Sequence, residues 1–270
     1  MDHPLRGLLD NTPRLTRVKL GYMPDLGIDW SRLVVLQVYV VDYPEGLLSV
    51  LSQTKQLEKL ATYTVFFEFN LDPKGTPLSL PFLKMLTLGD ARFLSVLQTP
   101  SLEGLSVASD LDTTITSFLT RSSCQLKSFG RRRYGGPSLH NILQHTPDLT
   151  HLSLDNHPDL VKAFGELSFH RGTLPLAPHL QSLTVLVPYL TEIGELSALL
   201  ESRATQVLDD AGHLLVQKLQ KLTVVELRQP AFKRAVVEEL RQQCQTQSIS
   251  FIVETAKYRV WPHDDHVLDW

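Results

Sequence analysis

A short apolar motif returns along most of this chain, and it constrains the fold more than any other feature of the sequence. Segment 12–20, which begins Thr-Pro, is repeated in similar form as segments 99–107 and 146–154. Counted from the leucine after this turn, each copy has apolar residues at positions one, four and six, a spacing written L-x-x-L-x-L. Further copies begin at Leu33, Leu57, Leu83, Leu126, Leu180 and Leu222. So many copies indicate one structural unit that is used repeatedly.

The distances between copies identify the kind of repeat. The first leucines of successive copies are separated by 18, 24, 26, 19, 24, 23, 31 and 42 residues. Most of these intervals are close to the roughly 20–29-residue period of leucine-rich repeats. The two longest intervals indicate an insertion or a lost copy towards the C-terminal end.

The motif also predicts how each unit folds. In a β-strand alternate side chains point to the same face, so positions four and six enter one core. One unit cannot bury its apolar edge alone, whereas stacked units share a continuous core. We therefore expect an α/β fold, a leucine-rich-repeat solenoid shaped as a curved horseshoe, with parallel strands inside and short helices outside. The alternative is an ordinary α/β domain with leucine-rich strands.

Segments between the strands have the apolar spacing of helices. We expect helices over residues 46–52, 93–98, 112–119, 138–144, 190–203, 214–221 and 231–243, and a last strand over 248–254. The leucine-rich-repeat domain is predicted to cover residues 1–256, with atypical repeats from about residue 186. Residues 257–270 are predicted to form a C-terminal tail or cap.

Composition narrows the environment and the partners. The 26 Lys and Arg against 29 Asp and Glu give a net charge of -3, which argues against a dedicated nucleic-acid surface. The two cysteines are too few for a disulfide-stapled secreted domain. No apolar run approaches the ~20 residues of a membrane span, and the first residues lack the pattern of a secretory signal. We expect an intracellular protein, cytoplasmic or nuclear, that binds neither membrane nor nucleic acid.

The phrasing of the repeat resembles that of a known family. Segment 145–152 (HTPDLTHL), together with the helix patterns at 47–52 and 196–202, resembles the repeat regions of fungal F-box proteins over about residues 8–253. The resemblance implies the substrate-recognition part of a ubiquitin-ligase receptor. The F-box, which docks on the adaptor of a cullin–RING ligase, is not visible here, because the first repeat already begins at Leu15. That adaptor is a partner only if the parent chain carries an F-box.

The most distinctive local feature is a basic cluster between glycines. Arg131, Arg132 and Arg133 lie beside Tyr134 where a repeat strand ends. Guanidinium groups can hold carboxylates or phosphates in bidentate fashion, and Arg and Tyr are enriched at interface hot spots. We predict these four residues as a partner-binding site. The alternative is a solvated loop in which the flanking glycines make turns.

Three other features have plainer interpretations. The sequence His263-Asp264-Asp265-His266 offers metal-ligand types, but neighbours in a tail rarely converge on one ion, so no metal site is predicted. The aromatic segment 63–70 is either an exposed anchor or, as we favour, a strand that extends into the core. Cys124 is expected to be an ordinary buried thiol.

Together these patterns predict a non-catalytic scaffold that binds a protein partner of unknown identity through its inner strand face and adjoining loops. No nucleophile elbow, phosphate loop, dinucleotide fingerprint or metalloprotease motif occurs in the sequence, and no cofactor is expected. Two alternatives stay open. One is a hydrolase-like enzyme on an irregular α/β fold, and the other is a truncated gene product without a selected partner.

Overall fold

The chain divides into two compact units, Met1–Gln125 (unit 1) and Leu126–Trp270 (unit 2). The structure, a computed structural model, describes residues 15–22, 29–41, 44–65, 75–108, 111–131, 139–154, 160–170, 174–187, 194–227 and 234–256. Both units are built from parallel strands and short helices, so the predicted α/β class is confirmed.

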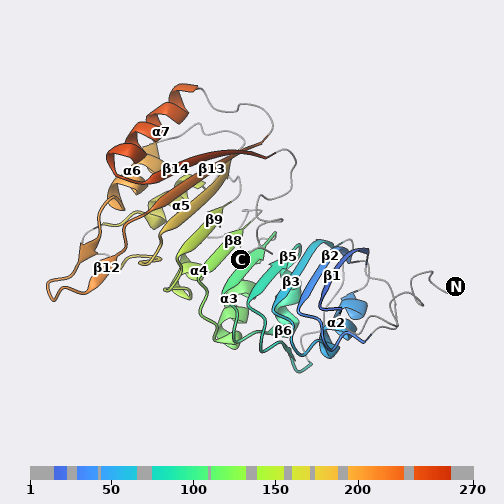
Figure 1. Cartoon of the computed structure of the whole chain (residues 1–270). Coiled ribbons are helices and arrows are strands. Elements are labelled where there is room, and N and C mark those ends of the chain that lie inside the picture. Colours follow the sequence, from blue (N-terminus) through green and yellow to red (C-terminus); the bar gives the residue numbers. More distant parts are fainter. Residues whose placement is uncertain are drawn as a thin grey trace. The chain divides into compact units, whose positions relative to one another are not determined.

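Unit 1 contains a sheet of five parallel strands. They are β1 (Arg17–Tyr22), β2 (Val35–Val41), β3 (Lys59–Val65), β5 (Met85–Leu88) and β7 (Gly104–Val107), in that order across the sheet. The short strands β4 (Leu78–Ser79) and β6 (Leu97–Gln98) form a separate parallel pair. The five strands of the main sheet therefore follow one another across it in the order of the sequence, as a repeat predicts (Figure 1).

Unit 2 has the same arrangement with five further parallel strands. They are β8 (Ser128–Arg131), β9 (His151–Leu154), β10 (Ser182–Val187), β13 (Lys221–Leu227) and β14 (Ser250–Ala256). The antiparallel hairpin of β11 (Val207–Leu208) and β12 (Leu214–Val216) comes between β10 and β13 in sequence. This hairpin lies within the longest interval between copies, where the sequence indicated an insertion.

Five of the strands are preceded by the same hydrogen-bonded turn. The N–H of the position-one leucine donates to the carbonyl three residues earlier, at 3.0–3.2 Å, for Leu33, Leu83, Leu102, Leu149 and Leu180. The carbonyl at position two then accepts from the N–H groups at positions two and three of the next strand. This bond pair recurs at Thr16, Val34, Glu58 and Lys84 in unit 1 and at Lys127, Thr150 and Gln181 in unit 2. The sequence repeat is thus a repeat of backbone geometry.

The strand register places the motif residues in two rows, mostly apolar, that enter the core. Position four is Val18, Leu36, Leu60, Leu86 and Leu105 in unit 1, and Phe129, Leu152, Leu183, Leu222 and Phe251 in unit 2. Apart from those in β1 and β14, which are the first and last strands, these side chains are buried. The register also makes Leu219 the position-one residue of β13, in place of the predicted Leu222. The L-x-x-L-x-L motif fits the sequence from either leucine. Because Leu222 pairs with Leu183, a position-four residue, and Leu219 is buried, the motif begins at Leu219.

Helices cover the core between successive strands, and most lie where apolar spacing predicts them. In unit 1 they are α2 (Pro44–Gln53), the 3-10 helix η1 (Ala91–Val96) and α3 (Asp112–Ser122). In unit 2 they are α4 (His140–Gln144), α5 (Leu160–Leu167), α6 (Gly194–Ser202) and α7 (Arg234–Thr246). Each helix for which burial is described turns a few apolar side chains inward, such as Leu47 and Leu51 of α2. None of the described helices has both the length and the apolar character needed to cross a membrane.

The helix predicted over 214–221 is wrong, because this segment contains β12 and the approach to β13. A hairpin turn decides the local structure instead. The Asp209 carboxylate accepts hydrogen bonds from the N–H groups of Ala211 and His213, and Gly212 has a positive φ of 81°. Glycine adopts this backbone conformation without steric cost, so the turn brings β11 and β12 together.

Candidate functional site

The sheet face opposite the core carries positions three, five and seven of each strand, and we call it the polar face. Because side chains alternate along a strand, these positions do not contribute to the apolar rows. They are therefore the positions that a repeat leaves free to vary. The predicted inner-face binding surface corresponds to this polar face, and its composition differs between the two units.

In unit 1 the polar face holds a cluster of four side chains from three adjacent strands. Lys19 of β1, Gln37 and Tyr39 of β2, and Tyr63 of β3 form this group, which we call the tyrosine cluster. The two tyrosine rings stack with centroids 5.1 Å apart and planes inclined by 24°. The Lys19 ammonium lies 5.1 Å from the centre of the Tyr39 ring, within the range of a cation–π interaction.

A buried amide positions both tyrosines of the cluster. Gln37 Nε2 donates to the hydroxyl oxygen of Tyr39 and to that of Tyr63, each at 3.1 Å. Gln37 is only 3% exposed, so its amide is fixed by its surroundings. Tyr39 remains 38% exposed and presents a ring and a hydroxyl in a defined orientation. Such rigid, amphipathic side chains are the usual anchors of protein interfaces.

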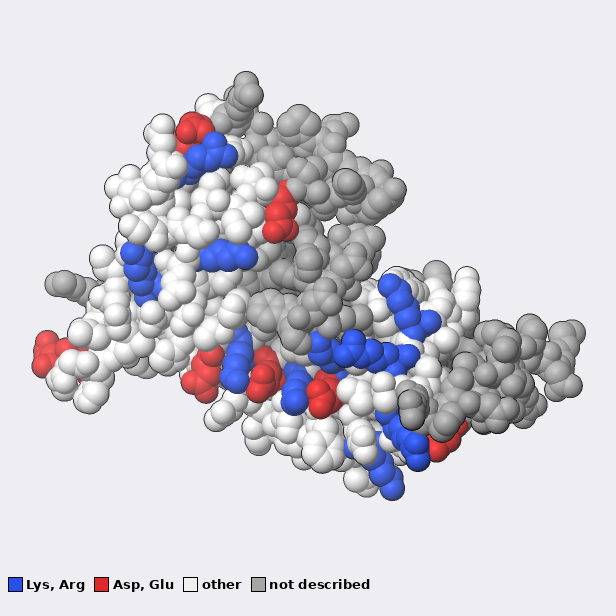
Figure 2. All heavy atoms as spheres, viewed as in Figure 1, with Lys and Arg blue, Asp and Glu red and all other residues white. Residues whose placement is uncertain are grey.

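The same face of unit 1 is basic. Arg17 and Lys59 occupy position three of β1 and β3, and Lys19 occupies position five of β1. Arg17 and Lys19 are exposed and Lys59 is half-buried. Within the described strands of unit 1, positions three, five and seven include no Asp or Glu. Figure 2 shows basic side chains over this unit with acidic side chains among them.

In unit 2 the polar face is lined by small hydroxyl side chains instead. Position three runs Ser128, His151, Ser182, Lys221 and Ser250, and position five runs Gly130, Ser153, Thr184, Thr223 and Ile252. Burial, and then the nearby charge of Lys221, lower the pKa of His151 below its ordinary value of 6.5. This histidine is therefore neutral near pH 7. The face offers hydrogen bonding but little charge and no described aromatic ring.

The predicted basic cluster is only partly within the described residues. Arg131 is the last residue of β8 and is fully buried. Its register partner is Leu154, so Arg131 occupies position six, where most other copies place an apolar residue. Arg132, Arg133 and Tyr134 lie outside the described residues, so a binding role for the cluster stays a prediction.

The other sequence candidates are resolved to different degrees. Cys124 is buried as predicted, and burial raises the pKa of its thiol to about 11, which keeps it unreactive. Of the aromatic segment, Tyr63 belongs to the tyrosine cluster, and residues 66–70 lie outside the described part of the chain. The same is true of His263 and His266. The described residues contain no group of three or more side chains suited to hold a metal ion.

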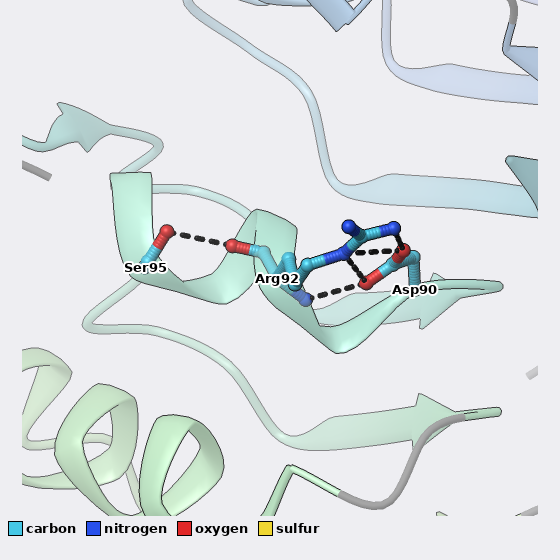
Figure 3. A network of polar contacts seen from close by, with 3 residues as sticks. All are labelled: Asp90, Arg92 and Ser95. Atoms are coloured by element: carbon cyan, nitrogen blue, oxygen red, sulfur yellow. Dashed lines mark hydrogen bonds and ion pairs between the residues drawn. The ribbon is translucent and has the colours of Figure 1, made fainter. Parts of the chain in front are cut away.

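Two further polar networks serve the fold. Asp90 caps η1 by accepting from the Arg92 N–H at 2.8 Å and also pairs with the Arg92 guanidinium, while the Ser95 hydroxyl donates to the Arg92 carbonyl (Figure 3). In unit 2 the buried Arg203 donates to the carbonyls of Leu167, Leu176 and Ala177. Both networks satisfy backbone groups of the fold, so neither is a candidate site.

Unit 1 also has a shallow apolar pocket of about 240 Å³, lined by Leu48, Gly75, Thr76, Leu78 and Val96. It is smaller than typical ligand pockets and has no convergent charged groups. The tyrosine cluster is therefore the best-built candidate among the described residues. Sequence reasoning did not find it, although its signal is present: Tyr39 and Tyr63 both occupy position seven of adjacent copies.

Comparisons with known proteins leave the family of this chain open. No protein-family model matches the sequence, and no curated protein matches it.

Proposed function

We propose that this chain is a leucine-rich-repeat-type solenoid that acts as a non-catalytic, protein-binding scaffold, and that its partner contacts the tyrosine cluster of unit 1. The repeated turn and the parallel strands support the repeat architecture. The observation that carries the binding role is the buried Gln37 amide, which orients two stacked tyrosines on an otherwise basic sheet face.

The chemistry of the cluster favours binding over catalysis. Tyr39 and Lys19 provide apolar surface, a hydroxyl and a positive charge, as interface anchors do. No nucleophile, base and acid converge around them within the described residues. Large preorganised aromatic side chains lose little conformational entropy on binding, so they contribute more to affinity than flexible ones.

The resemblance to F-box proteins adds a more specific hypothesis. If the chain is the substrate-recognition part of a ubiquitin-ligase receptor, its partner is a protein destined for ubiquitination. The cullin–RING adaptor would be recovered with the chain only if an F-box is present in the parent protein. Immunoprecipitation from the native cell, scored for that adaptor, tests this part separately.

The binding role is tested by comparing two variants in the same native cells. We expect Tyr39→Ala to lose the proteins that co-purify with the wild-type chain, because it removes the stacked ring and the hydroxyl. Lys55→Ala is the matched control, since Lys55 is exposed in the turn after α2 and lies outside the polar face. Quantitative mass spectrometry reads out both, after circular dichroism has shown that both variants are folded. Equal recovery of partners by the two variants would contradict the proposal.

A further inference from the structure

We propose that the apolar end of the core at β1 is a docking surface for residues 5–11 of the same chain, which pack on it as repeat helices pack beside later strands. Leu15, Val18 and Leu20 make up this surface, which we call the open end. Residues 5–11 lie outside the described residues, and what supports the proposal is their sequence together with the described repeats. It concerns the core of unit 1 and is independent of the binding role of the tyrosine cluster.

The open end differs in burial from the rest of the core of unit 1. Leu15, Val18 and Leu20 occupy positions one, four and six of the first copy, and each is only half-buried. The same positions of the second copy are at most 1% exposed: Leu33, Leu36 and Val38. β1 is the first strand in the order of the sheet. Because the exposed end of a solenoid core needs a cover, this surface calls for an apolar partner.

Described repeat helices show what such a cover consists of. Each pattern has three apolar residues, a threonine and then the position-one leucine, and its members are Leu47, Val50, Leu51, Thr54 and Leu57 at α2 and Leu139, Ile142, Leu143, Thr146 and Leu149 at α4. All of these side chains are buried, at most 7% exposed. The threonine hydroxyls donate to helix carbonyls, Thr54 to Leu51 at 2.8 Å and Thr146 to Ile142 at 3.1 Å. The pattern therefore joins a helix to the strand that follows it.

The segment before β1 has the same pattern at every position. Its members are Leu5, Leu8, Leu9, Thr12 and Leu15. In all three segments the position-one leucine comes ten residues after the first apolar residue. Asp10 and Asn11 stand where the α4 segment has Gln144 and His145, which are exposed. Residues 5–11 thus carry apolar residues where a repeat helix is buried and polar residues where it meets water.

The connection to β1 favours this segment over any separate molecule. Residues 5–11 are joined to the open end through the short stretch 12–14, so their docking is an intramolecular event at high effective concentration. A second copy of the chain is the alternative occupant, because it could bury the same apolar side chains at an interface between two molecules.

Hydrogen–deuterium exchange of the full chain, followed by mass spectrometry, tests the docking. We expect the amides of residues 8–12 to exchange at least about tenfold more slowly than in a synthetic peptide of residues 1–14, because docked backbone is protected. The peptide is the reference state, since isolated helices this short are unstable in water. Exchange in the full chain at the rate of the peptide would overturn the proposal.

Two matched variants test whether the segment covers β1. Leu8→Asp puts a charge at the position of the buried Ile142, so it should release the segment and speed exchange in β1 about tenfold or more. Gly7→Asp puts the same charge at the position of the exposed Asn141 and should leave exchange in β1 within about twofold. Unchanged exchange in β13 of unit 2 shows that each variant is folded. Equal effects of the two variants on β1 would contradict docking of residues 5–11.

Sedimentation equilibrium distinguishes this segment from a second copy. We expect slow exchange in residues 8–12 and in β1 at concentrations where the chain is a monomer. Protection of β1 that appears only as a dimer forms would assign the open end to a second copy and overturn the proposal.

Discussion

The two units share one backbone design and carry different surfaces on it. In both, a hydrogen-bonded turn leads into a parallel strand whose positions four and six enter the core. On the polar face, unit 1 has Lys19, Tyr39 and Tyr63, whereas unit 2 has mainly serine and threonine around His151. The repeat therefore determines the backbone and the core of both units, and the composition of the polar face varies independently of it.

The units also differ in how they satisfy carbonyls at helix ends. In unit 2, Arg203 is fully buried and donates to the Leu167 carbonyl at the end of α5 and to the Leu176 and Ala177 carbonyls before β10. In unit 1, Arg121 at the end of α3 donates to the Leu94 and Leu97 carbonyls and is partly exposed. Burial lowers the pKa of both guanidinium groups, that of Arg203 to about 10. Arg203 is therefore an interior residue of unit 2, whereas the guanidinium of Arg121 remains accessible to water.

The largest expected effect tests this second difference. Arg203→Met should lower the free energy of unfolding by about 3 kcal/mol or more, because it leaves three buried carbonyls without donors. Arg121→Met should cost about 1 kcal/mol, because water can reach the carbonyls that it exposes. Urea denaturation of the full chain measures both. Equal costs for the two variants would show that the arginines have the same role.

A smaller effect is expected in the core of unit 1. Thr62 occupies position six of β3, fully buried, and its hydroxyl has no hydrogen-bond partner among the described residues. Unit 2 has Val185 and Val224 at the equivalent position of β10 and β13. Thr62→Val should therefore raise the unfolding free energy by about 1 kcal/mol, since it removes an unpaired buried hydroxyl at nearly constant volume.

The control for this prediction is Thr120→Val. Thr120 is exposed on α3 and donates to the Thr116 carbonyl, so its replacement should not stabilise the protein. If Thr62→Val is destabilising in thermal or urea denaturation, the hydroxyl makes a favourable contact and the core rows of the two units are less alike than described.

The smallest expected effect lies on the polar face of unit 2. NMR titration should give His151 a pKa below 6.5, and Lys221→Met should raise it, because the lysine charge disfavours the imidazolium. A histidine with a lowered pKa in the folded state binds its proton more readily when unfolded. Its contribution to stability is thus complete above pH 6.5 and is lost as the pH falls through the folded-state value. An unchanged His151 pKa in Lys221→Met would contradict the electrostatic coupling across β10.

The sequence predicted the repeating frame well and the surface poorly. Leucine spacing is set by the core, so it located most helices and the strands of the large sheet up to β10, but not the short strands β4 and β6. It failed at residues 214–221, where the turn chemistry of Asp209 and Gly212 outweighs a leucine pattern that reads as a helix. It also placed the motif of β13 at Leu222 when the strand register begins it at Leu219. Two overlapping copies of the motif fit the sequence there, and only the pairing of the strands shows which of them is used.

The candidate site was missed for a different reason. Arginine-rich runs such as 131–133 are visible along the sequence, but the tyrosine cluster joins residues from three repeats. Only the strand register shows that Tyr39 and Tyr63 are neighbours and that Gln37 can reach both hydroxyls. The burial of Arg131 likewise depends on its position six in β8.

Hydroxyl-radical footprinting of the chain, with and without a partner recovered from cells, tests the central claim most directly. Tyr39 on the polar face of unit 1 is an exposed, readily oxidised side chain, and Leu208 on the β11–β12 hairpin of unit 2 is an exposed reference. We predict that the partner protects Tyr39 from oxidation and leaves Leu208 unchanged. Protection of Leu208 with unchanged oxidation of Tyr39 would contradict the assignment of binding to the tyrosine cluster.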